Sequence, residues 1–156
     1  MSLSRSTIRE TERQSIRKFV EDNAVLLSDR TLDYGCLDSP YKDLVTGEYV
    51  GWDVGQPKPT GLFDAVLCTQ VMEYVSRPKL VLQEFFDVLR PGGKLLLTYP
   101  TLWEEVEQND YWRFTKAGME LLLHQAGFNI LVHERRCEIR YEDFSLAIGY
   151  GAVCER

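Results

Sequence analysis

The sequence predicts an open α/β fold, in which helices cover a mostly parallel sheet and an antiparallel hairpin closes one edge. Strand and helix patterns alternate as far as Gly127, which is typical of parallel strands joined by crossovers. Two strand patterns then follow each other directly, which indicates an antiparallel pair. Of 156 residues, 44% are hydrophobic and 27% charged, a globular composition. We expect one domain over residues 1–156, with an N-terminal helix (1–30) and a sheet core (31–156).

The N-terminal segment, from Ser4 to about Leu27, carries apolar side chains at helical spacing. Arginines recur every four residues along this helix, at Arg5, Arg9, Arg13 and Arg17. A solvated face with intrahelical ion pairs is the commoner meaning of such a stripe. A basic stripe that grips a phosphate is the alternative.

The elements that follow are predicted in order from their local patterns. Strands are expected at residues 31–34, 49–54, 63–68, 94–98, 129–141 and 144–154, and helices at 77–89 and 116–125. The strand at 63–68 is predicted to be buried because nearly all of its residues are apolar. Pro91-Gly92-Gly93 is expected to stop the helix before it, whereas Thr115 is expected to cap the helix after it.

Composition excludes several classes of protein. The net charge of −6 disfavours nucleic acid as a partner, because phosphate binding requires a basic surface. The apolar runs, such as Leu95 to Leu97, are too short to span a membrane, and the polar first fifteen residues predict no secretory signal. The cysteines are far apart and only two histidines accompany them, so we expect free thiols in the cytoplasm and no metal site. They are Cys36, Cys68, Cys137 and Cys154.

Two acidic residues stand where strands of an open sheet end and ligands bind. Asp33 is followed by Gly35, which lets the backbone approach a ligand and exposes amide donors in the turn. About twenty residues later Asp53 ends the second strand, where a carboxylate can accept both hydroxyls of a ribose. An acidic residue at a strand end is equally often a turn former or a helix cap.

Four stretches then resemble one family, in the family's order and across nearly everything after Thr31. They are Leu-Asp-Tyr-Gly-Cys-Leu-Asp-Ser-Pro-Tyr at 32–41, Phe-Asp-Ala-Val-Leu-Cys-Thr-Gln-Val-Met-Glu-Tyr-Val at 63–75, Leu-Arg-Pro-Gly-Gly-Lys-Leu-Leu-Leu at 89–97 and Asp-Tyr-Trp-Arg-Phe-Thr at 110–115. The sequence resembles the class I S-adenosylmethionine-dependent methyltransferases, in particular a small bacterial, type-11-like branch. The resemblance implies a Rossmann-like methyltransferase fold and S-adenosylmethionine as cofactor.

Carried over by position, the resemblance implies three contact regions for this cofactor. The methionine part would face Asp33, Tyr34, Gly35 and Cys36. The ribose would be held by Asp53, and the adenine flanked by it and Val54. The methionine and the reacting methyl would be bordered by Cys68, Thr69 and Gln70.

The acceptor side is less defined by the sequence. The loop at 110–113 follows a strand's carboxyl end, so Asp110, Tyr111, Trp112 and Arg113 are expected over the pocket. A loop merely packed by its two aromatic side chains is the alternative. Candidates for a base, by residue type alone, are Glu73, Asp110, Tyr111 and His124.

Two departures from the family pattern carry predictions. Leu37 occupies the usual position of a second glycine, where a positive φ would strain leucine and its side chain would crowd the cofactor. The stretch at 54–62 is too short for the usual helix and strand, so we expect an extended crossover and a missing edge strand. The strand at 49–54 would then form the sheet's edge with Tyr49 and Trp52 exposed, which predicts a homodimer. Cover by the N-terminal helix or the crossover is the alternative.

Three functions follow from these patterns. The leading one is methyl transfer to an unidentified, small-molecule or other acceptor. The second is a non-catalytic binding or assembly module with a degraded cofactor site. A nicotinamide-dependent oxidoreductase is disfavoured, because no Gly-x-Gly-x-x-Gly follows the first strand.

Overall fold

A computed structural model describes residues 4–106 and 108–156. It forms a six-stranded sheet in the order β2-β1-β3-β4-β6-β5. The strands are β1 (Arg30–Tyr34), β2 (Glu48–Trp52), β3 (Phe63–Thr69), β4 (Leu89–Pro100), β5 (Asn129–Arg140) and β6 (Ser145–Glu155). The first four strands are parallel, and β6 runs antiparallel to both β4 and β5. The predicted sheet, with its antiparallel C-terminal pair, is confirmed.

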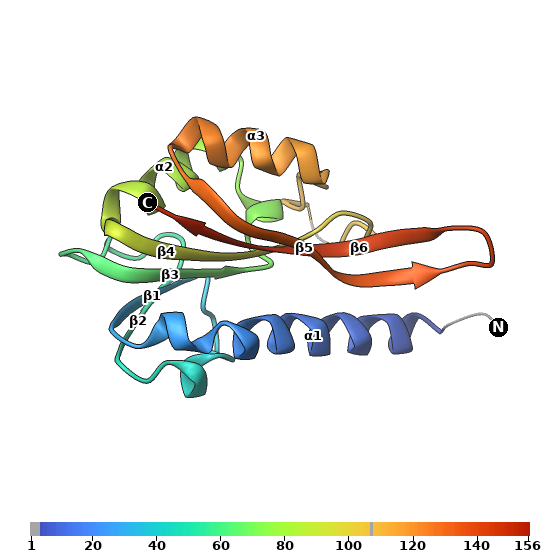
Figure 1. Ribbon diagram of the computed structural model, residues 1–156, viewed down its shortest axis with the longest axis horizontal. Coiled ribbons are helices and arrows are strands. Elements are labelled where there is room, and N and C mark those ends of the chain that lie inside the picture. Colours follow the sequence, from blue (N-terminus) through green and yellow to red (C-terminus); the bar gives the residue numbers. More distant parts are fainter. Residues whose placement is uncertain (1–3, 107) are drawn as a thin grey trace.

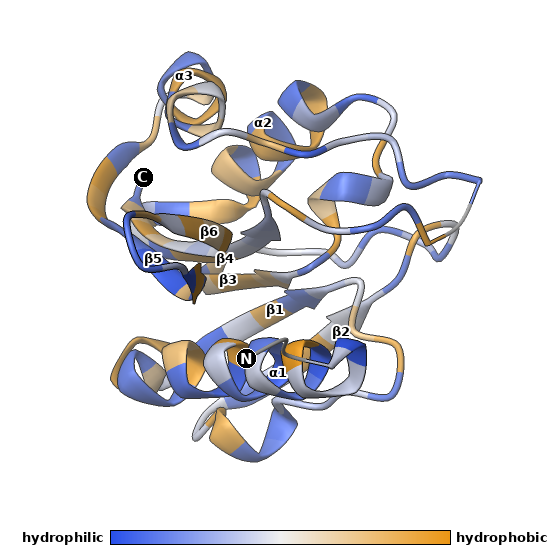
Figure 2. Ribbon diagram, turned by 90° about the vertical axis from the view of Figure 1, so that its right-hand side faces the viewer, coloured by the Kyte–Doolittle hydropathy of each residue, from blue (hydrophilic) through white to orange (hydrophobic). Residues whose placement is uncertain are grey.

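Helices cover both faces of this sheet (Figure 1). Helix α1 (Arg5–Asp22) lies on one face, and α2 (Pro78–Val88) and α3 (Lys116–Ala126) lie on the other. Short 3-10 turns join them: η1 (Ala24–Leu27), η2 (Lys42–Leu44) and η3 (Met72–Tyr74). The larger part of the core lies between the sheet and α2 and α3, and a smaller cluster lies under α1. Figure 2 shows the apolar strands enclosed between these two layers.

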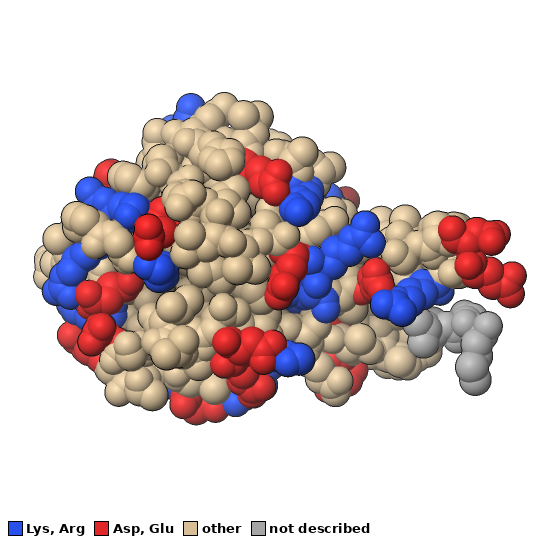
Figure 3. All heavy atoms as spheres, viewed as in Figure 1, with Lys and Arg blue, Asp and Glu red and all other residues tan. Residues whose placement is uncertain are grey.

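Helix α1 is shorter than predicted. It ends at Asp22, and residues 24–27 form the separate 3-10 turn η1, which places the buried Leu27 against the sheet. The helix packs closely because β6 carries Gly151 beneath it, where an added Cβ would lie 2.6 Å from the Phe19 ring. Intrahelical ion pairs, Arg17 with Glu21 and Lys18 with Asp22, support a solvated outer face, and Figure 3 shows acidic and basic side chains interspersed over this side of the molecule.

The helix predicted at 77–89 is confirmed as α2, but the strand predicted at 94–98 begins earlier, with Pro91-Gly92-Gly93 inside it. The helix ends at Val88 and β4 begins at Leu89, whose buried side chain lies in the core and whose backbone pairs with Phe63. A register shift before the Ala65–Lys94 pair then accommodates the proline and glycines. The predicted helix at 116–125 is confirmed, with Thr115 capping its start.

Strand β2 forms the edge of the sheet, and residues 53–62 cross to β3 without a helix or strand, as predicted. The expectation of exposed aromatics there is wrong. Trp52 is only 9% exposed, contacts the Tyr34 ring at 5.1 Å and donates from Nε1 to the Gln56 carbonyl at 3.1 Å. Tyr49 is half-buried and donates to Asp33 Oδ2 at 2.8 Å. The homodimer therefore stays a prediction that has lost this support.

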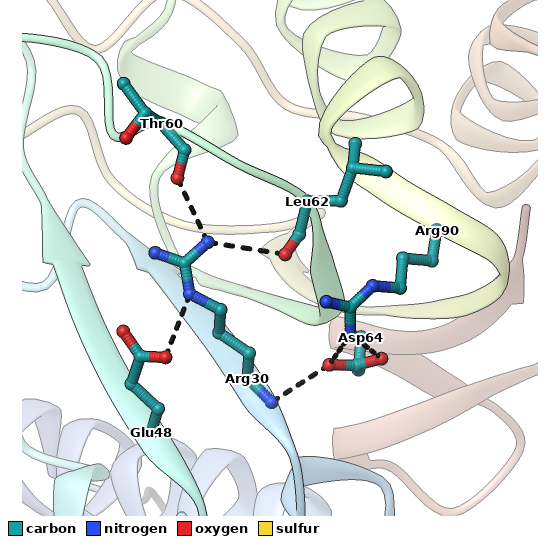
Figure 4. A network of polar contacts seen from close by, with 6 residues as sticks. All are labelled: Arg30, Glu48, Thr60, Leu62, Asp64 and Arg90. Carbon is teal, nitrogen blue, oxygen red and sulfur yellow. Dashed lines mark hydrogen bonds and ion pairs between the residues drawn. The ribbon is translucent and has the colours of Figure 1, made fainter.

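The amino-terminal ends of the parallel strands are joined by a network of polar contacts (Figure 4). Arg30 Nε contacts Glu48 at 3.0 Å, and Arg30 Nη1 donates to the carbonyls of Thr60 and Leu62 in the crossover. Asp64 accepts from the Arg30 amide at 3.1 Å and from Arg90 at 2.6 Å. At the carboxyl ends of the parallel strands, by contrast, cavities open between the loops.

The rest of the chain adds two structural facts. The four cysteines are free and buried. No helix within residues 4–106 and 108–156 is long and apolar enough to cross a membrane.

Candidate active site

A cavity of about 580 Å³ opens at the carboxyl ends of β1, β2 and β3. Six of the nine predicted cofactor residues line it: Gly35, Cys36, Asp53, Val54, Thr69 and Gln70. Helix α1 contributes Arg13 to the wall, and the loop after β3 contributes Val71 and Tyr74. This is the position at which open α/β sheets bind their ligands.

The loop after β1 approaches this cavity through its backbone. Gly35 has a φ of +71°, and a Cβ at that position would lie 2.5 Å from Val71 Cγ2, so only glycine fits. Leu37 adopts the predicted positive φ, at 43°, in the left-handed region that disfavours leucine. Its side chain lines the cavity and is 83% exposed, so it stands at the rim.

Asp53 both shapes the loop and faces the cavity. Its Oδ1 accepts a hydrogen bond from the Leu37 amide at 3.1 Å, and Cys36 Sγ lies 3.7 Å from Oδ2. A carboxylate has about four lone-pair positions, so these contacts leave acceptor capacity for a ligand's hydroxyls. Asp53 thus acts as a turn former and also lines the cavity, and its binding of a ribose stays a prediction.

The other three predicted cofactor residues have their side chains beneath the cavity. Asp33 is 1% exposed and accepts from Tyr49, and burial raises its pKa to about 6. Tyr34 and Cys68 pack in the core. Burial raises the pKa of the Cys68 thiol well above its ordinary value, an environment opposite to that of a nucleophilic cysteine.

A second cavity of about 340 Å³ adjoins the first. The two share Arg13, Gln70 and Tyr74 as a common wall. Of the predicted acceptor-side residues, Glu73, Asp110 and Arg113 line the second cavity. Apolar walls come from α1, the end of β4 and the loop after it: Ile16, Pro100, Trp103 and Val106.

Tyr111 and Trp112 line a separate, smaller pocket and not this cavity. Their amides donate to the Glu73 carbonyl at 2.8 and 3.2 Å, and Trp112 Nε1 donates to the Val75 carbonyl at 2.8 Å. The two residues therefore fasten the loop onto η3. His124 is exposed on α3 and lines neither cavity, so the structure does not bring it to the site.

Asp110 is an anchor for the same loop. Its two oxygens accept from Arg113 at 2.5 and 2.6 Å, and this guanidinium holds the pKa of the Asp110 carboxyl below its usual range. Arg113 also donates to the carbonyls of Trp103 and Glu104 at 3.1 and 2.7 Å. A carboxylate held in this way is a poor base.

The carboxyl group of Glu73, in the same cavity, lies in a different environment from that of Asp110. It is 3% exposed, and its Oε2 has no hydrogen-bond partner. Burial raises its pKa to about 7, and the nearby Asp110 carboxylate adds to the shift. Among the predicted candidates for a base, Glu73 combines a place on the cavity wall with a pKa near neutrality.

A buried ion pair that sequence reasoning missed holds α1 over the site. Glu12 and Arg136 lie 3.1 Å apart, with side chains 9% and 1% exposed. Arg136 also donates to Ser15 Oγ and to the Tyr150 carbonyl at 2.8 and 2.9 Å. The available signal was the spacing of Glu12, one helical turn from Ile8 and Ile16, which places a carboxylate on the buried face.

No cluster of three or more histidine, cysteine or acidic side chains suited to a metal ion occurs in the part of the chain that the structure describes.

A family model described as a methyltransferase domain matches residues 8–133 of the chain. No curated protein sequence matches it. The crystal structure of a SAM-dependent methyltransferase from Archaeoglobus fulgidus has a TM-score of 0.68 at 11% identity, with 98% of this chain and 100% of that chain covered.

Magnesium protoporphyrin IX methyltransferase from Synechocystis PCC 6803, solved with bound SAM, has a TM-score of 0.66 at 13% identity, with coverage of 100% and 86%. A methyltransferase from Mesorhizobium loti has a TM-score of 0.65 at 12% identity, with coverage of 94% and 98%. These similarities show a shared fold along nearly the whole chain. They do not single out the small bacterial branch.

Proposed function

Because the chain belongs to the class I S-adenosylmethionine-dependent methyltransferase family, we propose that its two joined cavities bind the cofactor and a methyl acceptor. The larger cavity takes S-adenosylmethionine and the smaller cavity takes the acceptor. The observation that carries this proposal is their common wall of Arg13, Gln70 and Tyr74, across which the two ligands would meet.

The residues of the larger cavity fit the cofactor. Gly35 lines the cavity and lets the loop after β1 pack against Val71, so we assign the methionine part to this loop. Asp53 retains acceptor capacity for the ribose hydroxyls, and Val54 stands beside it for the adenine. Val54 is 73% exposed and Leu37 stands at the rim, so we expect weak binding of the adenosine part.

When bound, S-adenosylmethionine supplies a methyl group on a positively charged sulfur. The protein would contribute to the rate mainly by positioning the two reactants, because reactants held in line react as in a unimolecular step. Gln70 stands at the junction with a φ of 54°, and its amide donates to the Thr98 carbonyl at 3.0 Å. A non-glycine residue held at positive φ is a form of strain often found at functional sites.

Calorimetric titration tests the proposal with three ligands: S-adenosylmethionine, S-adenosylhomocysteine and NADH. We expect the first two to bind and NADH not to bind. Failure of both adenosyl ligands to bind would overturn the methyltransferase proposal in favour of a non-catalytic module, which no observation on the described residues favours. Binding of NADH alone would indicate the oxidoreductase. The buried free thiols agree with action in the cytoplasm.

A further inference from the structure

Most charges around the smaller cavity neutralise one another. Three ion pairs account for them: Arg9 with Glu104 at 2.7 Å, Glu12 with Arg136 at 3.1 Å, and Asp110 with Arg113 at 2.5 Å. Two lining groups remain outside these pairs, the guanidinium of Arg13 and the carboxyl of Glu73. A ligand that fills this cavity therefore meets one cation and one carboxyl.

Glu73 is held firmly, although its carboxyl is not hydrogen-bonded at Oε2. It lies in η3, where its carbonyl accepts from the amides of Tyr111 and Trp112. Folded proteins rarely leave a buried polar side-chain atom without a partner, and such an atom calls for an explanation. A ligand's proton donor in the cavity would supply the missing partner.

Arg13 is the cation of the α1 stripe that stays available. Arg9 pairs with Glu104, and Arg17 pairs with Glu21 and Asp43 at 2.8 and 2.6 Å. Arg13 makes no hydrogen bond or ion pair with any residue that the structure describes, and it lines the common wall of both cavities. Among the described residues, the interpretation of the stripe as a phosphate-binding surface is therefore limited to the Arg13 guanidinium, which suits a carboxylate equally well.

We propose that the acceptor is a small organic acid carrying a hydroxyl group, with its anionic group on Arg13 and its hydroxyl facing Glu73. This inference rests on the proposed methyltransferase function and names the acceptor class. The cavity of about 340 Å³ suits a small molecule, and its apolar walls, Ile16, Pro100 and Trp103, suit a carbon skeleton between the two polar ends.

Glu73 acts as the base in the transfer step. The acceptor's O–H bond breaks and its proton passes to the Glu73 carboxylate. The acceptor's oxygen forms a bond to the methyl carbon as the methyl–sulfur bond breaks. The electron pair of that bond stays on sulfur, which leaves S-adenosylhomocysteine and a methyl ether.

The charges around Glu73 agree with this role. Burial, the Asp110 carboxylate and the Glu12 carboxylate all raise its pKa, whereas the Arg113 guanidinium and its own backbone amide lower it. The resulting pKa of about 7 lies near neutral pH, where a base is both present in its ionised form and effective. Geometry remains the first argument, because Glu73 lines the cavity and its buried Oε2 lacks a hydrogen-bond partner.

The test uses the 2-, 3- and 4-hydroxybenzoates, which span different separations of hydroxyl and carboxylate, with benzoate and phenol as controls. Each probe is titrated into protein saturated with S-adenosylhomocysteine. We expect at least one isomer to bind tenfold or more tighter than both controls. With S-adenosylmethionine, the same isomer should yield S-adenosylhomocysteine and its methyl ether.

Two variants separate the roles. Arg13→Gln should reduce affinity for the hydroxybenzoate tenfold or more and leave phenol unaffected. Glu73→Gln should keep hydroxybenzoate binding within about threefold, yet lower the transfer rate by a hundredfold or more and remove the acid limb of its pH profile. Arg17→Gln and Glu10→Gln are matched controls, because neither residue lines a cavity.

The acceptor class is overturned if no isomer outperforms benzoate and phenol in a protein that binds S-adenosylhomocysteine. The base is overturned if Glu73→Gln transfers at the parent rate. Loss of S-adenosylhomocysteine binding by the parent protein is a different result, since it removes the proposed function itself.

Discussion

The two ends of the parallel strands place particular carboxyl groups in different environments. At the amino ends, carboxylates such as Asp64 and Glu48 each contact an arginine, and the pKa of Asp64 is lowered by Arg90 (Figure 4). At the carboxyl ends, Asp33 and Glu73 are buried and their pKa values are raised to about 6 and about 7. Ion pairs join the strands at the amino ends, whereas the carboxyl groups of Asp33 and Glu73 are buried near the cavities at the carboxyl ends.

This contrast depends on the partners of the carboxyl groups. Protonation of a carboxylate that is paired with a cation destabilises the fold, whereas ionisation of a carboxyl that is buried without an ion pair destabilises it. Asp64 and Glu73 should therefore respond oppositely to pH and to neutralising substitutions.

The largest effect is expected where a buried charge would lose its partner near the cavity. Glu12→Ala leaves the Arg136 guanidinium, 1% exposed, without its carboxylate, which should cost about 3–5 kcal/mol in the free energy of unfolding. Urea denaturation measures this change. Glu21→Ala breaks an exposed pair with Arg17 and should cost under about 1 kcal/mol. Equal losses in the two variants would contradict the buried pair's role.

Glu73→Gln should stabilise the protein at high pH. The folded-state pKa of about 7 exceeds the ordinary value of 4.5, so the folded parent binds the proton more tightly and loses stability as pH rises through this window. At pH 8 the variant should exceed the parent by on the order of 2–3 kcal/mol, and below pH 4.5 that advantage should vanish. Denaturation curves at pH 4, 6 and 8 measure it.

The opposite end supplies the matched control. Asp64 has a lowered pKa because of Arg90, so its contribution to stability is present above the ordinary value of 3.8 and is lost as pH falls through the lowered folded-state value. Asp64→Asn should therefore destabilise the protein at pH 7 and lose this effect in acid. If the stability change caused by Asp64→Asn and that caused by Glu73→Gln varied with pH in the same direction, the proposed difference between the two carboxyl groups would be wrong.

Asp53→Ala should weaken S-adenosylhomocysteine binding by about 1.5–3 kcal/mol, because it removes charge-assisted hydrogen bonds to the ribose. Asp53→Asn is the companion variant, since its carbonyl can still accept from the Leu37 amide and keep the loop in place. Calorimetry compares the two. If Asp53→Ala binds as tightly as the parent, the ribose assignment is wrong.

Leu37→Gly should have the smallest effect. Glycine adopts the φ of 43° without the steric strain of leucine, and removing the rim side chain should tighten S-adenosylhomocysteine binding by about 1 kcal/mol. The greater chain entropy of glycine opposes any gain in stability. Calorimetry and denaturation on one preparation measure both quantities, and unchanged affinity would show that the rim leucine does not obstruct the ligand.

Local patterns predicted part of the larger cavity, because Gly35 and Asp53 follow strand patterns and such ends meet at one edge of the sheet. Gln70 was predicted only from the family resemblance. The positive φ of Leu37 was expected because the family has a glycine at its position. The exposure of Trp52 was predicted wrongly, because the carbonyl of Gln56 and the ring of Tyr34 reach it only after the crossover folds back.

The smaller cavity depends on contacts between distant residues. Glu12 and Arg136 are 124 positions apart, and no local pattern pairs them. The four arginines of α1 look equivalent in the sequence, yet three find acidic partners and Arg13 does not. Such differences arise from the placement of Glu104 and Asp43, which only the assembled fold determines.

If the two cavities bind cofactor and acceptor as proposed, both ligands would contact the common wall of Arg13, Gln70 and Tyr74, and their binding would be thermodynamically linked. A ligand that orders this wall from one side changes the affinity on the other side, and by reciprocity the second ligand changes the first affinity by the same factor. S-adenosylhomocysteine that remains after a turnover would then set how firmly the methylated product is held.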